Sequence, residues 1–163
     1  MRQMKGGERT MTRSYGSLLA VLLFGVLVLG LIGGVATPSA AGGQTLQTRR
    51  VPVDGVGSYT DVNAAGLAVM LGKKDFPLVN VHIPYEGDIK GTDLFIPFDQ
   101  VEAYLSKLPT DKGARVVLYC RSGRMSAIAA RTLVKLGYRD IWNLDGGMIA
   151  WEQAGYPVMR KGQ

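Results

Sequence analysis

Hydrophobic and polar residues follow two alternating patterns along the chain from about Arg49 onward. Short strand-like runs are separated by longer stretches in which apolar residues recur with the spacing of a helix. Two of the short runs, LVNV at 78–81 and VVLY at 116–119, are nearly continuous, which suits strands covered on both faces. The predicted strands are Arg50–Val53, Leu78–His82, Arg115–Tyr119 and Asp140–Leu144.

Four segments carry a helical pattern. They are Asp61–Leu71, Asp99–Leu108, a segment from Ser126 to about Gly137, and Ile149–Ala154. In the first, Val62, Ala65 and Val69 fall on one apolar stripe, and in the second Asp99 is placed to cap the helix. Strands that alternate with helices predict a single α/β domain with a mainly parallel central sheet, covered by helices on both faces.

An apolar segment lies near the N-terminus. No charged residue occurs between Arg13 and Arg49, and Leu18–Val35 is apolar throughout. As a helix these 18 residues would span roughly 27 Å, close to the thickness of a hydrocarbon core. Because basic residues precede the run, we expect the N-terminus to stay in the cytoplasm and the domain to be translocated.

The chain is therefore expected to have five parts. These are a basic N-terminus (1–17), a transmembrane anchor or signal segment (18–36), a flexible linker (37–48), the domain (49–158) and a tail (159–163). The length of the apolar run favours a retained anchor, with the domain on the extracytoplasmic side of the membrane. Small residues at Ser39 and Ala41 leave signal cleavage, and a secreted or periplasmic protein, as the alternative.

Composition narrows the chemistry. The chain has one cysteine, Cys120, and one histidine, His82, so neither a disulfide nor a metal site is expected, and no cofactor is predicted. The net charge is +6, but half of it precedes the apolar segment, and the remainder gives no basic stripe of the kind that binds nucleic acid. Cys120 is thus either an inert buried thiol or a residue that reacts alone with an external partner.

The stretch 115–130, RVVLYCRSGRMSAIAA, joins a strand to a helix through a short polar loop that begins at Cys120. The N–H groups of such a loop can point inward at the cysteine, and the helix that follows adds the positive end of its dipole. Both effects favour a thiolate, and Arg121 and Arg124 add two cations nearby. The loop is therefore predicted to be an anion site around a nucleophilic sulfur.

The spacing within the loop separates two kinds of anion site. A cysteine phosphatase has an arginine at the sixth position after its nucleophile, where it grips phosphate with two hydrogen bonds. Here the sixth position is Ser126, and the arginines occupy the first and fourth positions. The spacing therefore argues against phosphate as the ligand.

The loop CRSGRMS, 120–126, resembles the active-site loop of rhodanese domains, with five residues between the cysteine and a hydroxyl. The stretch NLDGGMIAWEQAGYPV, 143–158, is similar to the GG-x-x-AW-x-x-AG-x-PV ending of single-domain rhodaneses. The resemblance covers roughly Arg49–Val158 and is weaker between Leu78 and Gln100. Four residues of that weaker stretch depart from the family pattern: Asn80, His82, Asp88 and Lys90.

The resemblance implies a rhodanese-like domain that transfers a sulfane sulfur. Cys120 would attack the outer sulfur of a small anionic donor such as thiosulfate, become a persulfide, and pass the sulfur to a thiol or protein acceptor. Arg121 and Arg124 would attract the donor, and the hydroxyl groups of Ser122 and Ser126 would each donate a hydrogen bond to the bound sulfur. The substrate and persulfide loop comprises Arg121, Ser122, Gly123, Arg124, Met125 and Ser126.

Two questions stay open at this point. His82 falls at the carboxyl end of a predicted strand, as Cys120 does, and is either an accessory substrate-binding residue or an ordinary packing residue. A rhodanese-like domain can also bind or sense sulfur compounds with little turnover, although the intact cysteine favours catalysis. A thiol oxidoreductase is disfavoured, because no second cysteine is present to resolve a mixed disulfide.

Overall fold

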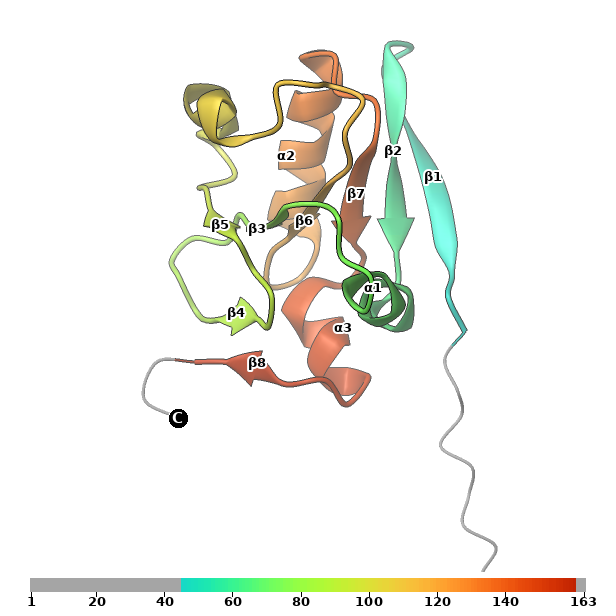
Figure 1. Cartoon of the computed structure of the whole chain (residues 1–163), viewed down its shortest axis with the longest axis vertical. Coiled ribbons are helices and arrows are strands. Elements are labelled where there is room, and N and C mark those ends of the chain that lie inside the picture. Colours follow the sequence, from blue (N-terminus) through green and yellow to red (C-terminus); the bar gives the residue numbers. More distant parts are fainter. Residues whose placement is uncertain (1–44, 161–163) are drawn as a thin grey trace, which may run out of the picture. The chain divides into compact units, whose positions relative to one another are not determined.

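The structure, a computed structural model, describes residues 45–160, and a six-stranded sheet runs through them (Figure 1). The predicted anchor or signal segment, 18–36, and most of the predicted linker lie outside the described residues, so both stay predictions. Within 45–160, no helix is both long and apolar enough to cross a bilayer.

The central sheet has the strand order β1-β2-β7-β6-β3-β5. Its strands are β1 (Thr48–Val53), β2 (Gly57–Val62), β3 (Leu78–Asn80), β5 (Leu94–Phe95), β6 (Val116–Tyr119) and β7 (Ile141–Leu144). β1 pairs antiparallel with β2, and every other neighbouring pair is parallel, which confirms a mainly parallel sheet. Two short strands, β4 (Asp88–Ile89) and β8 (Val158–Met159), form a separate antiparallel pair.

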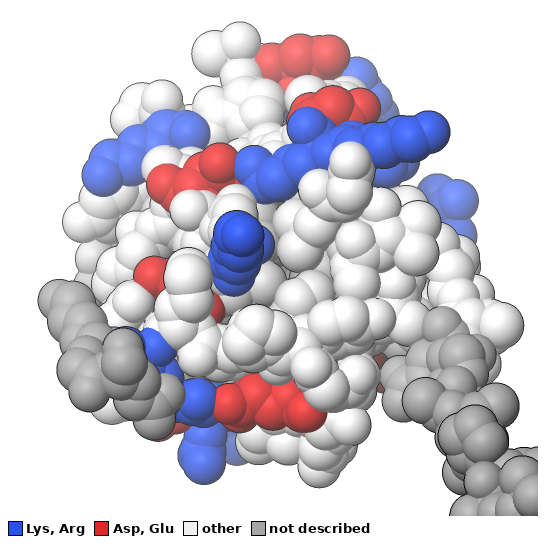
Figure 2. All heavy atoms as spheres, turned by 60° about the horizontal axis from the view of Figure 1, so that its bottom comes forward, with Lys and Arg blue, Asp and Glu red and all other residues white. Residues whose placement is uncertain are grey.

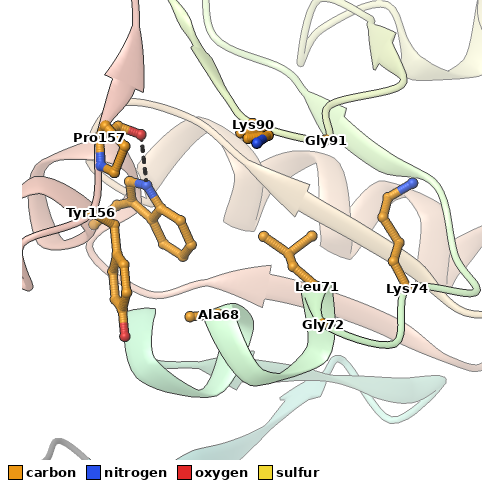
Figure 3. A pocket seen from close by; sticks show the side chains of 9 residues that line it. Ala68, Leu71, Gly72, Lys74, Lys90, Gly91, Tyr156 and Pro157 are labelled. Carbon is orange, nitrogen blue, oxygen red and sulfur yellow. Dashed lines mark hydrogen bonds between the residues drawn. The ribbon is translucent and has the colours of Figure 1, made fainter.

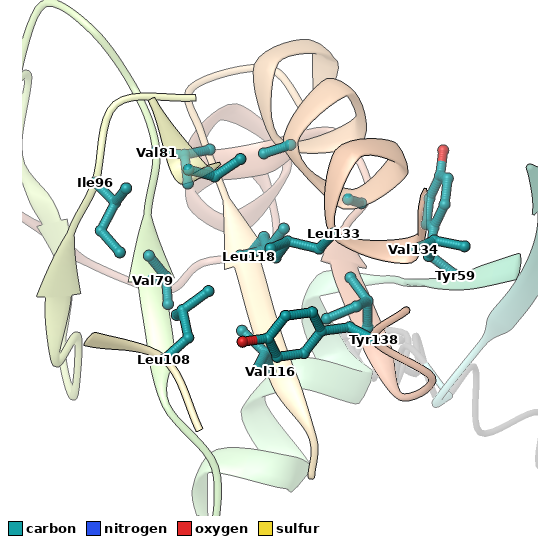
Figure 4. Close-up of a cluster of buried hydrophobic side chains, with 14 of the residues drawn as sticks. Tyr59, Val79, Val81, Ile96, Leu108, Val116, Leu118, Leu133, Val134 and Tyr138 are labelled. Atoms are coloured by element: carbon teal, nitrogen blue, oxygen red, sulfur yellow. The ribbon is translucent and has the colours of Figure 1, made fainter. Parts of the chain in front are cut away.

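Helices cover both faces of the sheet, as predicted. They are α1 (Ala64–Leu71), the 3-10 helix η1 (Val101–Lys107), α2 (Arg124–Lys135) and α3 (Gly147–Gln153). Successive side chains of a strand point to opposite faces, so β6 contributes to two cores. Leu118 packs with Leu133 of α2 in one core (Figure 4), and Val117 packs with residues of α1 and α3 in the other.

The first predicted helix begins later than the sequence pattern indicates. Residues 57–62 form β2, so α1 starts at Ala64 rather than Asp61. All six residues of β2 pair with β1, and this pairing outweighs the local helical pattern. Asn63 ends the strand and caps α1, because its side-chain oxygen accepts the N–H of the third helical residue at 2.9 Å. The predicted apolar stripe is also wrong at Val69, which is 66% exposed.

The second predicted helix, Asp99–Leu108, is a 3-10 helix with a kink at Tyr104. Apolar residues three positions apart lie on one side of either helix type, so the spacing alone does not separate the two. Asp99 does not cap it, because Gln100 occupies the N-cap position and makes no side-chain capping hydrogen bond. The third and fourth predicted helices are confirmed as α2 and α3, and each begins two residues earlier than predicted.

Candidate active site

Cys120 follows β6, a central strand of the sheet, at the point where the loop to α2 begins. The residue is 1% exposed, so its sulfur lies beneath the loop. Gly123 has a φ of 83°, a left-handed conformation that glycine adopts without steric cost. A side chain at this position would also crowd the backbone, since its Cβ would lie 3.0 Å from the nitrogen of Gly146. The loop can therefore turn this tightly only with glycine at position 123.

Among residues 45–160, two hydrogen-bond donors reach the sulfur of Cys120. The N–H of Gly123 donates to Sγ at 3.1 Å, and the hydroxyl oxygen of Ser126 lies 3.4 Å from Sγ. The same hydroxyl is 3.1 Å from the carbonyl oxygen of Gly123, so its one proton is shared between two acceptors. Helix α2 begins at Arg124, and its N-terminus adds the positive end of the helix dipole. All of these groups favour a negative charge on the sulfur.

The N-terminal turn of α3 supports the loop from its other side. The N–H groups of Met148 and Ile149 donate to the carbonyl oxygens of Cys120 and Arg121, at 2.9 and 3.0 Å. This approach requires glycine at position 147, where φ is 58° and a Cβ would lie 2.3 Å from the Cys120 oxygen. Gly146 and Gly147 therefore pack closely against the loop and belong to the site, although they lie far from Cys120 in the sequence.

The charged and polar side chains of the loop differ in their surroundings. Arg121 is exposed, and its Nε lies 3.1 Å from Oε2 of Glu86. Arg124 is also exposed and has no ion pair among residues 45–160. Of the two predicted serine donors, the structure brings Ser126 to the sulfur and leaves Ser122 exposed at the surface. Figure 2 shows one face of the molecule, on which small groups of basic side chains adjoin acidic ones.

His82 and Glu86 lie beside the loop. His82 is 7% exposed, and its Nδ1 is 3.3 Å from the sulfur of Met125. Its Nε2 is 3.3 Å from Oε1 of Glu86, without the geometry of a hydrogen bond. His82 therefore contacts the loop through Met125. Glu86 is not predicted from the sequence, because its position depends on how the segment after β3 folds back and no motif marks it.

A buried polar network holds the segment 82–88 in place. The Asn80 amide donates to the carboxylate of Asp88 at 3.0 Å and accepts the backbone N–H of His82 at 3.0 Å. The hydroxyl of Tyr119 donates to the same carboxylate at 3.1 Å and accepts a backbone N–H at 3.1 Å. Asn80 and Asp88, two of the residues that depart from the family pattern, thus help to position His82.

The network gives a pH-dependent prediction. Burial raises the pKa of Tyr119 well above its usual value of 10.0. The folded protein therefore keeps this proton at a pH where the unfolded chain has released it, and the free energy of unfolding falls as pH rises above about 10. In Tyr119→Phe the free energy of unfolding is expected to fall less steeply with pH, by up to ~1.4 kcal/mol per pH unit. Urea unfolding at several alkaline pH values checks this, and equal slopes in both proteins would contradict it.

A cavity of about 460 Å³ lies away from the loop (Figure 3). Ala68 and Leu71 of α1 form one side of it, and Trp151 of α3 with Tyr156 forms another. None of the residues that line it belongs to the loop 120–126. The cavity is therefore separate from the sulfur site.

Fold and site together define an α/β domain with one buried thiol, set among inward-pointing donors after a central parallel strand. The sequence profile of the rhodanese-like domain family matches residues 69–154, just over half of the chain. The chain belongs to the rhodanese-like domain family.

Several similar proteins are sulfurtransferases. A sulfurtransferase of Allochromatium vinosum is 37% identical over 89 residues, which cover 53% of this chain and 80% of that protein. The probable adenylyltransferase/sulfurtransferase MoeZ of Mycobacterium tuberculosis is 38% identical over 86 residues, covering 50% of this chain and 21% of MoeZ. The thiosulfate sulfurtransferase GlpE of Pseudoalteromonas translucida is 26% identical over 100 residues, covering 60% of this chain and 92% of GlpE. These relatives support a general role in sulfur transfer.

Solved structures agree on the fold. A rhodanese-related protein from Thermoplasma volcanium superposes with a TM-score of 0.52 and 29% identity, covering 61% of this chain and 96% of that one. A protein from Rhodopseudomonas palustris, described as a possible tyrosine phosphatase, superposes with a TM-score of 0.50 and 26% identity, covering 59% and 81%. The fold alone therefore does not distinguish sulfur transfer from phosphate chemistry. That distinction rests on the residues of the loop 120–126.

Proposed function

We propose that this protein transfers a sulfane sulfur from thiosulfate or a related small anionic donor to a thiophilic acceptor, through a persulfide on Cys120. The Cys120 thiolate attacks the outer sulfur of the donor and a new S–S bond forms. The S–S bond of thiosulfate breaks, and sulfite leaves with the electron pair. An acceptor, either a low-molecular-weight thiol or a partner protein, then takes the outer sulfur and returns the Cys120 thiolate.

The contacts of Sγ carry this proposal. The Gly123 N–H and the Ser126 hydroxyl both donate toward the sulfur, so the site can hold a negative charge on a thiolate or a persulfide. No ring nitrogen forms a hydrogen bond with Sγ among the described residues, so the proposed attack uses no histidine as general base. Burial of Cys120 favours a donor with a small terminal sulfur over a protein disulfide.

A persulfide also brings the transferred sulfur within reach of an acceptor, although Cys120 itself is buried. An S–S bond is about 2 Å long, so the transferred sulfur lies about 2 Å beyond Sγ on the side from which the donor entered. That sulfur can meet an acceptor which would not reach Sγ itself. A single buried cysteine therefore suits a one-thiol carrier.

A turnover assay tests the proposal. The domain is incubated with a sulfane donor and cyanide, and the release of thiocyanate is followed. The donors compared are thiosulfate, an organic thiosulfonate and an organic persulfide. Thiocyanate release that saturates with at least one of these donors is expected, and release no faster than in buffer with all three would reject the proposal.

The two serines of the loop give a matched pair of variants. Ser126→Ala removes a buried hydroxyl that donates toward Sγ, and we expect the rate of Cys120 persulfidation to fall by about fivefold. Ser122→Ala removes an exposed hydroxyl, and we expect less than about a twofold change. Quenched mass spectrometry measures both rates. A larger loss in Ser122→Ala than in Ser126→Ala would contradict the proposed geometry.

We also propose that the apolar segment 18–36 anchors the protein with its domain on the extracytoplasmic side. Its length and the basic residues before it support this topology. Protease added outside spheroplasts is expected to digest the domain while the protein stays in the membrane fraction. A full-length protein found in the soluble cytoplasmic fraction would contradict the anchor.

A further inference from the structure

The carboxylate of Glu86 lies between two side chains of the site. Its Oε2 is 3.1 Å from Nε of Arg121, and its Oε1 is 3.3 Å from Nε2 of His82. Arg121 follows Cys120 directly, and His82 contacts Met125 of the loop. The Glu86 side chain is 41% exposed, so this negative charge is accessible to solvent beside the loop.

Glu86 changes the charge that a donor meets. The sequence presents Arg121 and Arg124 as two free cations, but Arg121 is paired with Glu86 in the structure. The pKa of Arg160 is raised, first by its hydrogen bonds to Glu152 and to a smaller extent by the charges of Glu152 and Glu86. Arg160 is thus also near Glu86, but both of its terminal nitrogens are held by Glu152, at 2.6 and 2.9 Å. Arg124 has no carboxylate partner within residues 45–160.

A carboxylate beside the loop repels a donor in proportion to the donor's charge. We propose that Glu86 is a specificity-determining residue that shifts the preference among sulfane donors toward those with a single negative charge, such as thiosulfonates and organic persulfides, and away from dianions such as thiosulfate. This inference rests on the proposed sulfur transfer through Cys120, and it names the donor class for that site. Glu86 acts on the approach of the donor and takes no part in the bond changes.

Two donors of different charge and like chemistry test the inference. Thiosulfate carries two negative charges and releases sulfite, whereas methanethiosulfonate carries one and releases methanesulfinate. In both, the Cys120 thiolate forms the same new S–S bond and one S–S bond of the donor breaks. The quantity measured is the second-order rate constant of Cys120 persulfidation, by quenched mass spectrometry without cyanide, because cyanide is itself an anion.

Glu86→Gln removes the charge and keeps an oxygen that can accept from Arg121. We expect it to raise the rate constant for thiosulfate relative to that for methanethiosulfonate by at least about threefold at low ionic strength, and by less at high salt. If Glu86 only held Arg121 beside the loop, its loss would let this cation move away, and the rate constant for thiosulfate would fall relative to that for methanethiosulfonate.

Asp54→Asn is the matched control, since it removes one exposed carboxylate that is also paired with a single cation, Lys135. Lys135 is at the far end of α2 from the loop, about 16 Å along the helix from Arg124. The ratio of the two rate constants is expected to stay at the wild-type value in this variant. If both donors modify Cys120 and Glu86→Gln leaves the ratio unchanged, the inference on Glu86 fails while sulfur transfer stands. If neither of these donors nor an organic persulfide modifies Cys120 in any variant, both proposals fail.

Discussion

Cys120→Ser is expected to abolish thiocyanate release, with a loss of at least about a thousandfold in kcat/KM. A serine hydroxyl is not ionised near neutral pH and cannot form a persulfide, so both half-reactions are lost. The assay with a sulfane donor and cyanide measures this directly.

The same substitution should leave the fold intact. Serine is close to cysteine in size, and its oxygen can accept the Gly123 N–H that donates to Sγ in the wild type. We expect the free energy of unfolding to change by about 1 kcal/mol. Thiocyanate release by a folded Cys120→Ser protein at the wild-type rate would show that another group carries the sulfur.

Gly147→Ala is expected to have the largest effect on stability. A Cβ at this position would lie 2.3 Å from the carbonyl oxygen of Cys120, and the left-handed φ of 58° is itself unfavourable for alanine. The turn must shift, which weakens the hydrogen bonds from the N-terminus of α3 to the loop. We expect a loss of about 3 kcal/mol in the free energy of unfolding, measured by urea denaturation, and slower persulfidation of Cys120.

Gly155→Ala separates the two causes of this loss. Gly155 also has a positive φ, 87°, but a Cβ there would meet no atom within 4 Å. This variant therefore carries the backbone cost alone, about 1 kcal/mol, and should persulfidate at the wild-type rate. Equal losses in the two variants would mean that the close contact between Gly147 and Cys120 contributes nothing.

Much of the site follows from local sequence signals. The loop 120–126 lies between an apolar strand and a helix, and chain connectivity alone places Cys120 between the end of β6 and the start of α2. The continuous apolar run of β6 likewise marks a strand covered on both faces, as the structure confirms. These features depend on neighbours in the chain, which is why residue spacing predicts them.

Other features depend on contacts between distant segments. The predicted helix Asp61–Leu71 includes the last two residues of β2, because the sequence pattern does not show that pairing with β1 decides the conformation of residues 57–62. Spacing cannot distinguish Ser122 from Ser126 as the donor to Sγ until the loop is folded. Glu86 reaches Arg121 only through the fold of the segment after β3, and nothing in its immediate sequence predicts a role at the site.

The charge of Glu86 also reduces the positive charge that the loop presents to a donor. Two arginines near a nucleophilic cysteine suggest a site for a dianion when only the sequence is considered. In the structure one of these arginines already has a carboxylate partner. Counting loop cations without their partners therefore overstates the attraction for thiosulfate.

The most direct test of sulfur transfer is the mass of the protein after brief exposure to a sulfane donor. We expect the domain to gain the mass of one sulfur atom, to lose it on addition of cyanide, and to carry it on the peptide that contains Cys120. A domain that stays folded and gains no mass with thiosulfate, a thiosulfonate or a persulfide would contradict a sulfur-carrying Cys120 and leave a binding or sensing role for this fold.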